Sequence, residues 1–155
     1  MYKFDHLIVG AGIIGSSTIN NIIEEIKKKH FKKKTFIKLG IIDQNLENFP
    51  GGIAYSLNKS LYGYFNNPIR LSNIKFIKWI KIKKNKKKII NYLDRYGGLS
   101  GKKWVVKNRD ILFGKNTNEF MELYLPRFSY ELWLQDAFLR TVKKIKSLKK
   151  KNILI

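Results

Sequence analysis

The chain has 155 residues, enough for one domain with a buried core, and it contains no cysteine, which excludes disulfides, thiolate metal sites and cysteine nucleophiles. Its formal net charge is +21, but lysine, asparagine and isoleucine are all abundant while arginine is scarce. This bias is typical of A/T-rich codon usage, and the scarcity of arginine argues against a sequence-specific nucleic-acid reader. No apolar run reaches the roughly 18 residues of a membrane span, and no signal peptide precedes the first predicted strand. We therefore expect a cytoplasmic protein with a single domain over residues 1–155.

The first predicted element is a strand over residues 4–9, which ends in a glycine-rich turn with the spacing G-x-G-x-x-G. Helical periodicity follows over residues 13–29, with apolar side chains at Ile19, Ile22, Ile23 and Ile26. Strand, turn and helix in this order are the setting that the dinucleotide fingerprint requires. The predicted cofactor contacts here are Gly10, Ala11, Gly12, Ile13, Ile14 and Gly15.

Each glycine of the turn has a distinct predicted role. Gly10 allows the tight turn, Gly12 lets a pyrophosphate approach the backbone, and Gly15 lets the helix pack close to the strand. The free N–H groups and the positive dipole end of the helix then favour phosphate.

A second apolar strand is predicted over residues 35–43, and it ends in Asp43. Its nearly continuous apolar character is typical of a parallel strand buried on both faces. An acid at this position is placed to accept hydrogen bonds from ribose hydroxyls, so we predict that Asp43 and its neighbour Gln44 contact the cofactor. We also expect residues 4–9 and 36–43 to pair in parallel, with the helix between them as the crossover.

The rest of the chain is predicted to alternate between helices and short strands. Residues 44–73 are irregular, and residues 74–96 are predicted to be helical in two pieces broken near 83–88, followed by a helix stop at Gly97-Gly98. Residues 103–113 contain a predicted strand at Trp104-Val105-Val106. A helix is predicted over residues 127–148 after Pro126, and a third strand over 152–155.

The six side chains expected to face the core from the two helical pieces are Phe76, Ile77, Ile80, Ile89, Ile90 and Leu93.

Three later segments resemble motifs of a flavoprotein family, in the family's order. Residues 51–56, GGIAYS, resemble a G-x-A-Y-S motif, and residues 65–72, FNNPIRLS, resemble an L-L-N-x-P…R-M-S stretch. Residues 125–134, LPRFSYELWL, resemble a P-R-x-x-x-G-x-Y-L segment that opens a long helix. The chain thus resembles the FAD/NAD(P)-binding flavoproteins with a glutathione-reductase-like fold, including enzymes of the FAD-dependent urate-hydroxylase kind.

This resemblance implies a fold, a cofactor and a further contact. The fold class is α/β, a Rossmann-like FAD/NAD(P)-binding βαβ domain with a parallel sheet. The cofactor is FAD, with NAD(P)H as a candidate reductant, and Arg127 is expected near the flavin or its phosphates. Flavoproteins of this kind are at least twice as long and continue with a returning strand and a G-D motif that meets the ribityl chain. We therefore expect the N-terminal portion of a flavin-dependent oxidoreductase or monooxygenase, incomplete at its C-terminus and inactive unless a partner chain supplies the missing half.

Two alternatives stay open. One is an inactive nucleotide-binding remnant. The other is a polyanion-binding protein that uses the lysine clusters at residues 27–34, 81–88 and 143–151. The sequence does not identify a substrate, catalytic residues or a metal site.

Overall fold

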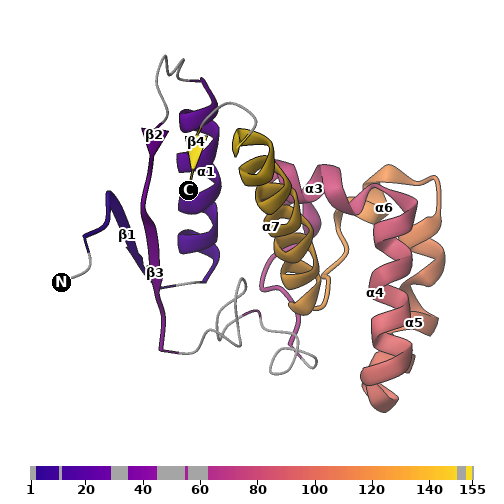
Figure 1. Cartoon of the computed structure of the whole chain (residues 1–155). Coiled ribbons are helices and arrows are strands. Elements are labelled where there is room, and N and C mark those ends of the chain that lie inside the picture. The colour runs from indigo at the N-terminus through magenta and orange to yellow at the C-terminus, as the bar shows by residue number, and fades with distance from the viewer. Residues whose placement is uncertain are drawn as a thin grey trace. The chain divides into compact units, whose positions relative to one another are not determined.

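The computed structural model describes residues 3–10, 12–28, 35–44, 55, 63–149 and 153–154. Helices hold most of these residues (Figure 1), and the strands among them form two two-stranded parallel sheets. The predicted fold class, a Rossmann-like FAD/NAD(P)-binding βαβ domain, is therefore wrong. The middle of the chain supplies helices where such a domain would need further strands. The chain divides into two compact units, Met1–Ile53 with Leu134–Ile155, and Ala54–Trp133.

The first unit contains the two sheets. Strands β1 (His6–Val9) and β3 (Leu39–Ile42) pair in parallel, and α1 (Ile13–Lys28) connects them. This confirms the predicted parallel pairing with an intervening helix. The predicted strand over 35–43 is interrupted, because β2 (Thr35–Phe36) pairs with β4 (Ile153–Leu154) in a different sheet.

The core of the first unit lies between β1 and α1. Ile8 is buried together with Ile19, Ile23 and Ile26, which follow one another at helical spacing on α1. The other three side chains of β1 are exposed, and Ile42 at the end of β3 is 53% exposed. The prediction that the second strand is buried on both faces is therefore wrong, because α1 covers the face that carries Ile8.

The C-terminal part of α7 (Phe128–Lys149) packs against α1 through polar side chains. The hydroxyl of Thr141 is buried and donates to Asn20 Oδ1 at 2.8 Å. One turn further along, Lys144 forms an ion pair with Glu24. These contacts bring together residues that lie more than a hundred positions apart in the sequence.

Helices dominate the second unit. After the short 3-10 helix η2 (Ile69–Leu71) come α3 (Ile74–Ile80) and α4 (Lys83–Tyr96), with the break at residues 81–82. The side chain of Asn85 is buried at this break and donates to the backbone oxygen of Trp79 at 2.8 Å. All six core positions predicted on these two helices are buried, which confirms that part of the sequence analysis.

The helix α5 (Gly98–Phe113) contradicts the predicted strand at Trp104-Val105-Val106. Helix α4 ends at Tyr96 with Gly97 as its C-cap, at the predicted stop, and Gly98 has a left-handed φ of 55° that lets α5 turn back alongside α4 (Figure 1). The strand prediction relied on β-branched and aromatic propensity, which tertiary packing overrides here. A short helix, α6 (Thr117–Met121), follows.

An aromatic cluster joins α3 to the start of α7 in the second unit. Phe76 is fully buried, and its ring centroid lies 4.6 Å from that of Tyr130 and 5.7 Å from that of Trp133. Phe65 contacts both Phe76 and Tyr130 with edge-to-face geometry. Burial in this cluster raises the pKa of the Tyr130 hydroxyl, although a backbone hydrogen bond from Asn73 partly offsets the shift.

We expect Phe76→Ala to lower the free energy of unfolding of the second unit by about 3–5 kcal/mol, since it leaves a cavity at the centre of the aromatic cluster. The three tryptophans of the chain all lie in the second unit, so denaturation followed by tryptophan fluorescence reports on this unit. Leu99→Ala is the matched control, because Leu99 is 79% exposed. Equal losses for the two variants would contradict the central role of Phe76.

Candidate functional site

The predicted glycine turn leaves β1 in a conformation that glycine favours. Gly10 has a left-handed φ of 93°. Its backbone N–H donates to the carbonyl oxygen of Ile42 at 2.8 Å, so the turn is tied to the end of the neighbouring strand β3. The turn is thereby fixed at the carboxyl edge of the sheet, where α1 begins.

Helix α1 starts in very close contact with this turn. A Cβ atom placed on Gly15 would lie 1.9 Å from the backbone oxygen of Gly10 and 3.3 Å from the Ile8 side chain. No other residue type fits there without moving the helix away from the strand. The packing role that the sequence predicts for Gly15 is confirmed, while its contact with a cofactor stays a prediction.

The register of the sheet brings the turn and the predicted ribose acid to one edge. Val9 lies opposite Ile42, so Gly10 and Asp43 are the residues that follow on each strand. Asp43 is partly buried, and Gln44 beside it is exposed. The structure therefore brings the predicted residues Gly10, Asp43 and Gln44 together at the carboxyl edge.

The other predicted residues of the turn are placed as follows. Ile13 and Ile14 are the first residues of α1, and the side chain of Ile14 is 83% exposed. Gly12 precedes them, and its carbonyl oxygen accepts the N–H of Ser16 at 2.9 Å. Ala11 lies outside the described residues. The first turn of α1 contains no acidic residue, so the positive end of the helix dipole is not neutralised by its own sequence.

Arg127 belongs to the second unit, where it holds an extended segment in place. Its Nε donates to the backbone oxygen of Tyr64 at 2.9 Å, and its Nη2 donates to Asn66 Oδ1 at 3.1 Å. Its backbone N–H donates to the oxygen of Gly63 at 2.8 Å. The sequence analysis missed this structural role, and the predicted place of Arg127 beside a flavin or its phosphates stays a prediction.

One aromatic residue from each of the three segments that resemble flavoprotein motifs lies in a shared contact in the second unit. Tyr55, Phe65 and Tyr130 each come from a different segment, and their rings lie 5.4–6.3 Å apart between centroids. Apart from Tyr55, residues 51–56 lie outside the described residues. The signal that would have predicted this contact is that each segment carries at least one aromatic residue.

In the part of the chain that the structure describes, no group of three or more His, Cys, Asp or Glu side chains is arranged to hold a metal ion. No helix in that part is long and apolar enough to cross a membrane.

Comparison with known proteins identifies distant relatives without a stated activity. No family model matches the chain, and no solved structure matches it. Uncharacterized proteins of Mycobacterium bovis and Mycobacterium tuberculosis are each 23% identical over 147 residues, which cover 90% of this chain and 26% of the relative. The chain therefore spans about a quarter of the length of the curated relatives it matches. The resemblance to FAD-binding flavoproteins stays a prediction.

We expect Gly15→Ala to destabilise the first unit by roughly 1–3 kcal/mol, since the added methyl group forces α1 away from β1 and the turn. Hydrogen exchange of α1 amides measures this loss directly. Ser17→Ala is the matched control, because Ser17 is exposed on the same helix. Unchanged protection of α1 in Gly15→Ala would show that the helix does not depend on this contact.

Proposed function

We propose that the chain binds the diphosphate-bearing end of FAD at the turn between β1 and α1. The observation that carries the proposal is the parallel register of β1 and β3, by which Gly10 and Asp43 leave the same edge of the sheet. In this arrangement the phosphates contact Gly12 and the first N–H groups of α1, and the adenosine ribose contacts Asp43. The proposal rests on this local strand–turn–helix geometry and not on the overall fold class.

The electrostatics of α1 support an anionic ligand. The helix has 16 residues, and its first N–H groups have no acceptor within the helix itself. With no acid in the first turn, a diphosphate would meet these donors and the positive dipole end together. Backbone donors of this kind recognise phosphate without a lysine or arginine at the site.

The role of the chain's own residues is to bind and orient the cofactor. FAD, when bound, supplies hydride and electron transfer, and the protein supplies position and surroundings. On the sequence resemblance alone, we extend the proposal to a flavin-dependent oxidoreductase of which this chain holds the adenosine-diphosphate end. NAD(P)H is then a candidate reductant, and no substrate is assigned.

We expect Gly12→Val to abolish binding of FAD and of ADP while leaving the protein folded, since two methyl groups would occupy the space that the diphosphate needs. Calorimetric titration with each ligand measures the affinity, and circular dichroism measures folding. Ser17→Val places the same valine side chain at an exposed position of α1 and should bind as the wild type does. Wild-type affinity in a folded Gly12→Val protein would place any nucleotide site elsewhere. Binding of ADP but not of FAD by the wild type would instead favour the nucleotide-binding remnant.

We expect Asp43→Ala to weaken FAD binding roughly 10- to 150-fold, because a charge-assisted hydrogen bond to a ribose hydroxyl is worth about 1.5–3 kcal/mol. Binding of inorganic pyrophosphate, which has no ribose, should not weaken. Asp94→Ala changes the net charge equally at an exposed position of the second unit and controls for general electrostatics. Equal effects on FAD and on pyrophosphate would contradict the ribose contact.

A further inference from the structure

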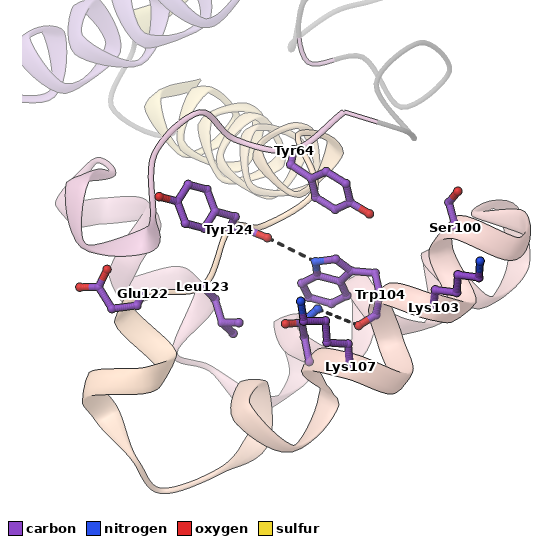
Figure 2. A pocket seen from close by; sticks show the side chains of 9 residues that line it. Tyr64, Ser100, Lys103, Trp104, Lys107, Glu122, Leu123 and Tyr124 are labelled. Atoms are coloured by element: carbon purple, nitrogen blue, oxygen red, sulfur yellow. Dashed lines mark hydrogen bonds between the residues drawn. The ribbon is translucent and has the colours of Figure 1, made fainter.

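One face of α5 lines an open cavity of about 520 Å³ in the second unit (Figure 2). Four residues of this helix line the cavity: Lys103, Trp104, Lys107 and Asn108. Lys103 and Lys107 are four residues apart, as are Trp104 and Asn108, so the four side chains lie on one side of the helix. The facing wall includes Tyr64 and the segment Glu122–Tyr124. A volume of this size is typical of small-molecule sites.

The aromatic floor of the cavity is held in a fixed orientation. The indole N–H of Trp104 donates to the backbone oxygen of Tyr124 at 3.3 Å, and the side-chain amide of Asn108 donates to the backbone oxygen of Trp104 at 2.9 Å (Figure 2). Trp104 and Asn108 are both buried, whereas Tyr64 and Tyr124 are partly exposed. The fixed Trp104 ring offers its exposed part to a planar ligand with little further loss of side-chain entropy, and Tyr64 and Tyr124 add exposed ring surface beside it.

The cavity is lined by two positively charged side chains and one negatively charged side chain. Lys103 and Lys107 lie four residues apart on α5, where like charges repel each other. Among the described residues, neither the Lys103 nor the Lys107 ammonium group forms an ion pair. Glu122 also lines the cavity, but its Oε1 lies 2.6 Å from Arg70 Nε, which offsets its charge. Figure 2 shows Glu122 on the opposite side of Trp104 from Lys103. The lysine end of the cavity therefore carries an excess positive charge.

We propose that this cavity binds a small planar aromatic anion, with its ring against Trp104 and its anionic group between Lys103 and Lys107. A ligand of this kind covers the exposed ring surface of Tyr64 and Tyr124 and relieves the repulsion between the two lysines. Neither an apolar ring nor a simple anion would do both. This site does not depend on the proposed function at the glycine turn, since it is built from residues of the second unit alone.

The test uses three probes that separate the ring from the charge. They are 2-naphthoate, the neutral 2-naphthalenemethanol, and cyclohexanecarboxylate, which is an anion without an aromatic ring. Calorimetric titration of the full chain should show saturable binding of 2-naphthoate, and binding roughly tenfold or more weaker for each of the other two. Absence of 2-naphthoate binding at millimolar concentration, or equal affinity for all three probes, would overturn the proposal.

Variants then locate the site. Trp104→Leu should reduce 2-naphthoate affinity. The double variant Lys103→Gln/Lys107→Gln should also reduce this affinity, because it removes the two cationic groups, and it does so without removing a buried side chain. The matched control is Lys87→Gln/Lys102→Gln, which removes two exposed lysines that do not line the cavity. An equal loss in the control pair would show general attraction to a basic surface and contradict the site. Gly12→Val should bind 2-naphthoate as the wild type does, so failure of the glycine-turn proposal and failure of this one are separately visible.

Discussion

The approach of α1 to the end of β1 is the contact on which the first unit depends. The space between Gly15 and the carbonyl of Gly10 holds no side chain, and a single methyl group there would overlap the backbone. Because interiors are close-packed, moving α1 outward would also separate Ile23 from Ile8 in the core. The same contact sets the position of the helix N-terminus relative to the sheet edge that carries Asp43. Packing and the proposed phosphate contact therefore depend on one small residue.

The second unit depends on a different interaction, the packing of aromatic rings around Phe76. That cluster brings Phe65 and Tyr130 together, and the Arg127 hydrogen bonds to Tyr64 and Asn66 add a polar connection between the same two segments. Helix α7 contributes to both units with different parts. Its start belongs to the aromatic cluster, whereas its later turns, with Thr141, contact α1. One continuous helix thus supplies apolar contacts to one unit and polar contacts to the other.

The sequence predicts those features that depend on short-range patterns. Glycine spacing and apolar periodicity were enough for β1, α1 and their parallel partner β3, and for the buried positions of α3 and α4. The fold class was wrong because it extrapolated from this local unit to the whole chain. At Trp104-Val105-Val106 the residue types favour a strand, but burial at Trp104, Asn108 and Leu112 follows a four-residue spacing typical of a helix. The lysines of the cavity were missed because this region was predicted to contain a strand. On the helix Lys103 and Lys107 lie about one turn apart, whereas on a strand the same two residues would be farther apart.

The high positive charge makes electrostatic attraction a poor guide to specific sites in this protein. A chain with a net charge of +21 attracts any anion at low ionic strength, and salt screens exposed charges over about 10 Å at 0.1 M. Specific recognition must then come from groups whose contribution depends on geometry. At the turn these are backbone N–H groups at the start of α1, and in the cavity they include the fixed ring of Trp104. Both proposed sites place such oriented groups beside a positive potential, which comes from the helix dipole at the turn and from Lys103 and Lys107 at the cavity. The diphosphate at the turn, or the aromatic ring at the cavity, therefore decides which anion stays bound.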